Sequence, residues 1–132
     1  MKGVVAVVLR DDKFLVIRRS QQVRAPGMYC FPGGGIEADE SEEQAVVREF
    51  AEELGAPIVP RQRLWMSRTV TKVELAWWQV ELPEVAQLHP NPLEVESIHW
   101  LTHEEALALP QLLASNRDFY AAWHRGDFDL RR

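Results

Sequence analysis

Residues 34–56, GGIEADESEEQAVVREFAEELGA, decide the architecture of this chain. Eight of the twenty acidic residues fall between positions 37 and 53, directly after a run of three glycines. Carboxylates packed this closely repel one another unless a cation joins them. The segment therefore predicts a metal site, and its oxygen ligands favour Mg²⁺ or Mn²⁺ over zinc.

A helix through this segment would gather its carboxylates on one face. Glu49, Glu52 and Glu53 are spaced i, i+3 and i+4, which covers roughly 100° of a helix surface. Their oxygens can therefore converge on one point. The neighbouring stripe is apolar and would face a core. It consists of Val46, Phe50 and Leu54, with Val47 at its margin.

The ends of this helix can also be read from the sequence. Ser41 followed by Gln44 predicts a capping box at the start, and Gly55 marks the end. Arg48 and Glu52 lie one turn apart, so they can form an ion pair that holds a carboxylate in position. Alone, such a pair on an acidic helix face would indicate only a solvated structural feature.

The spacings around the helix resemble the signature of the Nudix hydrolases, the MutT-type family. The pattern in this chain is Gly34-x5-Glu40-x7-Arg48-Glu49-x2-Glu52-Glu53-x-Gly55. The lead-in, residues 29–34, is similar to the strand that enters the catalytic loop of the family. Three positions depart from the usual signature, but they affect packing and loop shape and leave the chemistry intact. They are Asp39, Phe50 and Ala56.

The resemblance implies a single α/β domain over residues 1–132, built as a Nudix-type α/β/α sandwich with a mixed sheet. Length and composition agree, since 132 residues with 46% hydrophobic and 27% charged content suit one small domain. Patterning predicts strands at 3–9, 14–18, 63–67, 72–81 and 96–101. A capping box of Thr102 and Glu105 predicts a short helix, and Ser115 opens a closing helix that runs to about His124.

By resemblance, the helix carboxylates bind the metal. Glu49 and Glu53 would bind Mg²⁺, or Mn²⁺, with help from Glu52 and the carbonyl of Gly33. Either Glu49 or Glu52 would orient or deprotonate the attacking water, and which of the two does so stays open.

Carboxylates outside the helix receive other roles. Glu40 would hold the loop and the helix together, either through Arg48, which belongs to the same catalytic group, or through metal-bound water. A further metal ligand is expected from a loop or strand after the signature, where Glu94 and Glu96 are the candidates. Glu94 is preferred because its offset from Trp100 resembles that of the loop glutamate of MutT-type enzymes.

Three residues are assigned to the substrate by the same resemblance. Arg19 matches a phosphate-contacting arginine, and Gly34 belongs to the same substrate-binding loop. Asn116 resembles the asparagine that reads an oxidised guanine, since an amide can both donate and accept a hydrogen bond. The alternative is that Ser115 and Asn116 only cap the closing helix.

Aromatic residues are the candidates for stacking on a base. Phe31, Trp77 and Trp78 are the candidates for the base pocket, and Phe31 and Trp78 are assigned to it. Trp77 and Trp78 are adjacent in an expected strand, so they point to opposite faces and at most one of them lines the site.

Charge and cysteine usage limit the partners. A net charge of −5 argues against binding long nucleic acid, which needs a basic face. The single cysteine, Cys30, excludes an intramolecular disulfide and reads as a buried filler, which fits a reducing cytoplasm. The apolar run at 4–9 is too short for a signal or membrane segment. A homodimer stays open.

Together these features predict a metal-dependent hydrolase of a small nucleotide. The favoured reaction converts a nucleoside triphosphate, including an oxidised one, to the monophosphate and pyrophosphate. The alternatives are a hydrolase of a nucleoside diphosphate linked to a sugar or a second nucleotide, and a non-catalytic nucleotide-binding module.

Overall fold

Strand β1 (Lys2–Val7) lies at the centre of the fold, because both of its faces are buried in a computed structural model that describes residues 1–132. Val4 and Ala6 pack into one hydrophobic cluster, whereas Val5 and Val7 pack into a second cluster. Alternate side chains of a strand point to opposite faces. The chain therefore has a core on each side of the sheet.

The sheet that contains β1 is mixed, as expected. Its order is β5 (Gly33–Gly35), β1, β7 (Glu74–Glu81) and β6 (Val59–Arg68). β1 runs parallel to β7, and the other two pairings are antiparallel. The glycine run that precedes the helix is thus itself a strand.

A second sheet is built around β3 (Lys13–Arg19). One edge of β3 pairs with β8 (Val95–Leu101), and the other pairs first with β2 (Leu9–Arg10) and then with β4 (Tyr29–Cys30). The turn between β2 and β3 has positive φ at both Asp11 and Asp12, which suits a tight hairpin.

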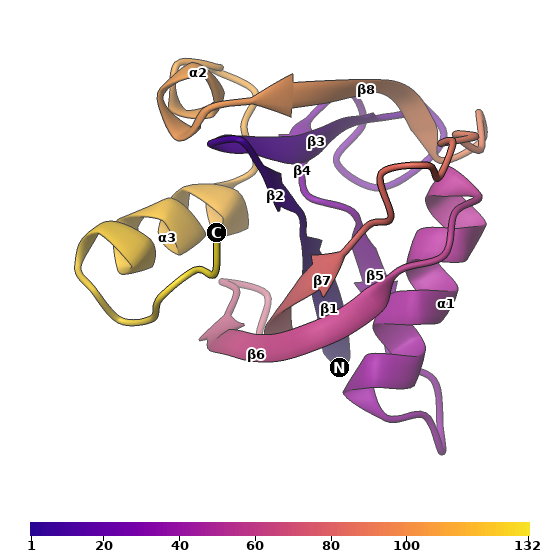
Figure 1. Ribbon diagram of the computed structural model, residues 1–132, viewed down its shortest axis with the longest axis horizontal. Helices are drawn as coiled ribbons and strands as arrows, with labels where there is room; N and C mark the ends of the chain where they lie inside the picture. Colours follow the sequence, from indigo (N-terminus) through magenta and orange to yellow (C-terminus); the bar gives the residue numbers. More distant parts are fainter.

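Helices cover the two faces of the sheet, which confirms the expected sandwich. α1 (Glu42–Leu54) buries Val46, Phe50 and Leu54 against the cluster on one face. α3 (Ala114–His124) buries Phe119 and Tyr120 on the other face, and α2 (His103–Leu107) lies between β8 and α3 in sequence. Figure 1 shows α1 and α3 on opposite sides of the strands.

The helix ends confirm two predicted capping boxes and correct one helix start. Ser41 and Gln44 form the box of α1, and Thr102 and Glu105 form that of α2. Gly55 ends α1 in the left-handed region, with φ of 63°. α3 instead begins after Leu113 with no side-chain cap, so the reading of residues 115 and 116 as caps is wrong.

The expected strand at 3–9 ends at Val7, with Leu9 and Arg10 in the separate strand β2, and two other strands start more than one residue from the expected position. β6 begins at Val59, four residues earlier than expected, because an edge strand tolerates Pro60 where the register shifts. β7 begins at Glu74 instead of Lys72, since Lys72 has φ of 65° in the turn that precedes the strand.

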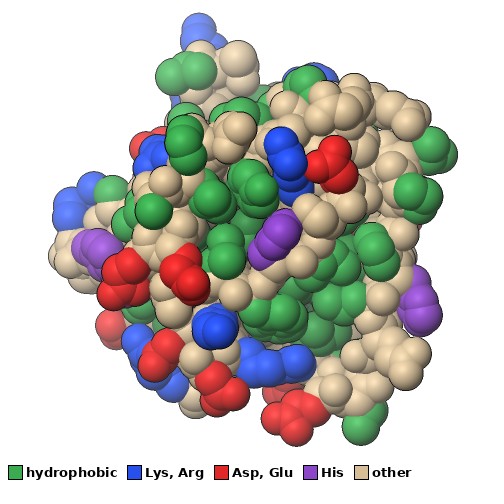
Figure 2. Space-filling view, turned by 90° about the horizontal axis from the view of Figure 1, so that it is seen from above, with side chains coloured by type: hydrophobic (Ala, Val, Ile, Leu, Met, Phe, Trp, Pro, Cys, Tyr) green, Lys and Arg blue, Asp and Glu red, His purple; other side chains and the backbone are tan.

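The face over β8 and α2 mixes all side-chain types. Figure 2 shows acidic and basic side chains interspersed around apolar ones on this face, with no broad basic area. That pattern agrees with the net charge of −5. None of the helices is long and apolar enough to cross a membrane.

Candidate active site

Arg48 ties the loop before α1 to the carboxylates on the helix. Its Nε donates to Oε2 of Glu40 at 2.6 Å, and its Nη2 donates to Oε1 of Glu40 and to the carbonyl of Gly35, both at 2.9 Å. Its Nη1 donates to Oε1 of Glu49 at 2.9 Å and lies 3.3 Å from Glu52. The expected link between Glu40 and Arg48 is therefore present.

This bonding fixes the charges at the loop. The hydrogen bond from Arg48 lowers the pKa of Glu40 from 4.5 to about 2, helped by the backbone N–H of Glu37. The same contacts raise the pKa of the Arg48 guanidinium. Both groups therefore stay ionised near neutral pH, and the ion pair between Arg48 and Glu40 persists there.

Glu53 is a buried carboxylate at the inner side of the helix. Only 6% of the residue is exposed, and its Oε1 accepts a 2.9 Å hydrogen bond from the backbone N–H of Gly33. Burial, then the charges of Glu49 and Glu94, raise its pKa from 4.5 to about 8. Burial also raises the pKa of Glu49, against the opposing effect of Arg48. The carboxylates therefore repel one another at close quarters.

Backbone hydrogen bonds from the loop before β8 bring Glu94 to this cluster. The N–H of His89 donates to the carbonyl of Leu54 at 2.7 Å, and the N–H of Asn91 donates to that of Glu53 at 2.8 Å. These bonds use carbonyls at the end of α1 that lack helical partners. Asn91 in turn accepts a 3.0 Å hydrogen bond from the N–H of Glu94.

The structure distinguishes between the two candidate ligands outside the helix. Glu94 lies close enough to raise the pKa values of Glu49 and Glu53, and its Oε2 is buried with no hydrogen-bond partner. Glu96 instead pairs with Arg18 at 3.2 Å on the exposed side of β8. Glu94 is thus the one placed to complete the cluster.

The glycines of β5 permit the close packing of these groups. A Cβ on Gly34 would lie 2.6 Å from Oε1 of Glu49, and closer still to the rest of that carboxylate. A Cβ on Gly33 would lie 3.1 Å from Cα of Val5, and closer still to the carbonyl of Val4. A Cβ on Gly35 would meet nothing within 4 Å.

The donor set fits a divalent metal, although the side chains do not form a ready-made cage. No three His, Cys, Asp or Glu side chains are arranged as a metal-binding group in this structure. However, Glu49, Glu53 and Glu94 offer only hard oxygen donors, and one oxygen of Glu94 has no partner. A cation among them would offset both causes of the raised pKa values, burial first and then the charges of the neighbouring glutamates.

A cavity of about 510 Å³ opens beside this cluster. Its walls come from the start of β1, the β5 glycines, the loop 20–27, the turn between β6 and β7, and the start of α3. Arg19 lines it and is held by bonds from Nε to the carbonyl of Arg24 and from Nη1 to Sγ of Cys30. Cys30 is buried, as expected, and burial raises its pKa to about 11.

Asn116 lines this cavity and has one side-chain nitrogen without a hydrogen-bond partner. Its Oδ1 accepts a 3.0 Å hydrogen bond from the N–H of Phe31, whereas its Nδ2 is buried and has no partner. Only 1% of the residue is exposed. Because Oδ1 already accepts from Phe31, the donor Nδ2 is the unused hydrogen-bonding group of this amide.

The aromatic assignments need correction. Trp78 packs on the α1 face of β7 and donates from Nε1 to Glu42 at 2.8 Å, so it does not line the cavity. Trp77 lines the cavity, but it is fully buried in the core on the α3 face. Phe31 is 3% exposed and stacks on Phe14, so it forms cavity floor rather than a free stacking face.

Sequence reasoning missed two positioning residues. Ser20 is 4% exposed, and its N–H and hydroxyl donate to the carbonyls of Glu94 and Leu93. Asn91 accepts at its Oδ1 from the N–H of Leu93 at 3.1 Å. The Asn91-Pro92 pair was a readable turn signal, whereas nothing around Ser20 indicated a role.

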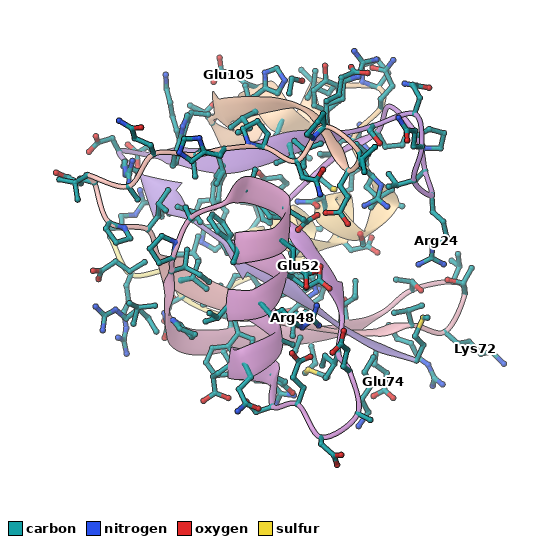
Figure 3. All side chains as sticks on the ribbon, turned by 90° about the vertical axis from the view of Figure 1, so that its right-hand side faces the viewer. Arg24, Arg48, Glu52, Lys72, Glu74 and Glu105 are labelled. Carbon is teal, nitrogen blue, oxygen red and sulfur yellow. The ribbon has the colours of Figure 1, made fainter.

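The side chains of this site gather on one side of α1. Figure 3 shows Arg48 and Glu52 projecting from the same side of the helix, with Arg24 and Lys72 on loops toward that side. Glu52 is the most exposed of the helix carboxylates in the Arg48 network, with 52% of its side chain accessible.

Comparison with known proteins supports what the fold and the carboxylate helix indicate. The NUDIX domain family model matches residues 1–123. A CTP pyrophosphohydrolase from Escherichia coli (strain K12) is 34% identical over 113 residues, which cover 81% of this chain and 79% of that protein.

Two solved structures share the fold over almost the whole chain. The MutT protein from Methanosarcina mazei Go1 is 27% identical with a TM-score of 0.78, covering 96% of this chain and 94% of that one. The E. coli ORF135 protein is 30% identical with a TM-score of 0.75, covering 95% and 89%. These matches define a hydrolase of the MutT type.

The chain belongs to the Nudix family. Nudix hydrolases use divalent metal ions such as Mg²⁺ and act on small nucleotide substrates.

Proposed function

We propose that this protein is a Mg²⁺-dependent pyrophosphohydrolase that converts a nucleoside triphosphate to the monophosphate and pyrophosphate. The observation that carries the proposal is the convergence of Glu49, Glu53 and Glu94 beside a cavity of about 510 Å³. A cavity of this volume suits a small organic molecule.

The carboxylates would hold the metal, and the loop glycines would allow its approach. Glu49, Glu53 and Glu94 are the proposed ligands, with the carbonyl of Gly33 as a further one. When bound, a divalent cation neutralises phosphate charge and lowers the pKa of water. Arg48 keeps Glu49 in place by donating to its Oε1 at 2.9 Å.

A helix carboxylate would take the proton of the attacking water. The water oxygen would bond to the α- or β-phosphorus while the bridging P–O bond breaks, and the leaving group, pyrophosphate or the nucleoside monophosphate, would depart as an anion. Glu52 is open to solvent and is held by Arg48 only at 3.3 Å, so it can accept that proton. Glu49 is the other candidate base, but its bond to Arg48 and its role as ligand compete with this task.

The lining of the cavity supports a substrate whose nucleobase presents a carbonyl group. The free Nδ2 of Asn116 needs an acceptor, and both a cytosine and an oxidised guanine carry one. The similarity to a CTP pyrophosphohydrolase supports the pyrimidine, and the resemblance of Asn116 to the MutT asparagine supports the purine. Arg19 and Gly34 would contact the phosphates. Trp78 is not part of this proposal.

The test is release of pyrophosphate from a panel of canonical and oxidised nucleoside triphosphates, with Mg²⁺ and then with EDTA. The proposal expects Mg²⁺-dependent pyrophosphate from at least one triphosphate. Glu49→Gln and Glu53→Gln should each lose at least about tenfold in turnover, which is about 1.4 kcal/mol of barrier. Glu104→Gln, a matched change at an exposed position of α2, should retain wild-type turnover.

Two other results would redirect the assignment. Turnover of nucleotide sugars or dinucleotides without pyrophosphate would identify a hydrolase of diphosphate-linked substrates. Nucleotide binding without turnover of any panel member would identify a non-catalytic binding module.

A further inference from the structure

A second cavity, of about 490 Å³, lies at the opposite end of the central strands. Residues 3–5 of β1 line the first cavity, whereas residues 8–10, which follow β1, line the second. A strand rises by about 3.3 Å per residue, so the nearest lining residues along the chain, Val5 and Val8, are about 10 Å apart, and the two cavities share no lining residue. The second cavity therefore has no part in the proposed active site.

Arginines dominate the charge of this second cavity. Four arginines are among its lining residues, Arg10, Arg61, Arg131 and Arg132, against two glutamates, Glu81 and Glu84. Arg61 pairs with Glu81 at 2.7 Å, and Arg132 pairs with Asp12. Arg10 and Arg131 have no carboxylate partner, although the protein as a whole carries a net charge of −5.

The guanidinium of Arg10 is held in place before any ligand arrives. Its Nη2 donates to the carbonyl of Leu82 at 2.8 Å. Its central carbon lies 5.0 Å from the ring centroid of Trp100, within the range of a cation–π contact. These contacts use one face and one N–H, so the remaining donors stay available at a low entropic cost.

Hydrogen bonds from a buried glutamine hold the backbone of Arg131 beside the same cavity. The Nε2 of Gln79 donates to the carbonyl of Arg131 at 2.7 Å, and its Oε1 accepts from the N–H of Arg131 at 2.9 Å. Gln79 is 7% exposed, and Phe128, also buried, anchors the segment just before. Figure 1 shows the C-terminus lying between α3 and the strands. These two hydrogen bonds use only backbone atoms of Arg131, so its side chain is not engaged by Gln79.

We propose that this second cavity binds the phosphate group of a small anion. Paired guanidinium donors match phosphate oxygens in geometry and charge. The lining also includes Val8, Val80 and Leu82, and the volume exceeds what inorganic phosphate fills. The cavity therefore has room for the organic part of a phosphorylated molecule. This site is separate from the proposed hydrolysis and does not depend on it.

Amide chemical shifts in the metal-free protein test the proposal. Inorganic phosphate, pyrophosphate and a nucleoside monophosphate are titrated separately in EDTA. We expect saturable shifts at the amides of Gln79, Val80 and Leu82 for at least one of them. Shifts with inorganic phosphate would identify free phosphate as a sufficient ligand, and shifts only with the monophosphate would show that the organic part is needed.

Matched variants decide whether the arginines carry the binding. Combining Arg10→Gln with Arg131→Gln should weaken binding by at least about tenfold, because both charge-assisted contacts are lost. The control combines Arg68→Gln with Arg125→Gln, which removes the same charge away from the cavity and should leave binding unchanged. Thermal unfolding verifies that both variants fold. The absence of shifts at these amides, or equal weakening by both double variants, would overturn the proposal.

Discussion

Replacing Gly34 with alanine should inactivate the enzyme without unfolding it. The new Cβ would lie 2.6 Å or less from the Glu49 carboxylate, whereas an ordinary contact requires 3.4–4 Å. The three atoms nearest to it belong to the flexible end of the Glu49 side chain, so the backbone can remain in place. The carboxylate must instead move by about 1 Å.

A displacement of this size has a predictable effect on catalysis. A misplacement of about 1 Å in a catalytic group can lower the rate about a hundredfold, or about 2.7 kcal/mol of barrier. Stability should change little, because alanine also restricts the unfolded chain, a gain of about 0.4–1 kcal/mol at a compatible site. Steady-state kcat/KM with Mg²⁺ and thermal unfolding measure the two effects.

The neighbouring glycines supply the controls. Gly35→Ala meets nothing within 4 Å, so it should retain wild-type activity and stability. Gly33→Ala runs into the backbone of Val4 and Val5, so it should lower the melting temperature as well as the activity. If Gly34→Ala keeps more than about a third of wild-type kcat/KM, catalysis does not require the space that Gly34 leaves for the Glu49 carboxylate.

Three further outcomes are expected. Glu94→Gln should weaken Mg²⁺ binding by at least about tenfold in calorimetric titration, whereas Glu96→Gln should leave it unchanged; equal effects would contradict the placement of Glu94. The metal-free protein should lose stability as pH rises from 4.5 to about 8, because folded Glu53 keeps its proton over this range while unfolded Glu53 does not. In urea unfolding with EDTA, the free energy of unfolding should depend less on pH for Glu53→Gln than for the wild type. Asn116→Asp keeps the acceptor for Phe31 but removes the free donor, so KM should rise about tenfold, and an unchanged KM would exclude Asn116 from substrate binding.

The local features of the site could be predicted from the sequence. The capping box of Ser41 and Gln44, the left-handed Gly55 and the pair of Arg48 with Glu52 all depend on residues within one helix. Short-range spacing determines such contacts, so no knowledge of the fold was needed.

Features that depend on distant strands could not be predicted in the same way. The sequence indicated that Trp77 and Trp78 face opposite sides, but not which side holds the cavity, because β7 is buried on both faces. The pairing of Gly33–Gly35 with β1 has no side-chain pattern to reveal it. The position of Glu94 was expected only by resemblance, since it depends on loop bonds to the end of α1.

Because β1 pairs in parallel with β7, the signature segment, residues 34–56, depends on later parts of the chain in order to fold. Lys2 lies opposite Glu74, so forming this pair closes a long stretch of polypeptide, which is slow and costly in entropy. β5 is held by β1, and its Gly33 in turn bonds Glu53. A fragment ending after α1 would contain every signature glutamate but would lack β7 and the support it gives to β1. Such a fragment should remain unstructured, and the carboxylate cluster would form only after more than half of the protein has been synthesised.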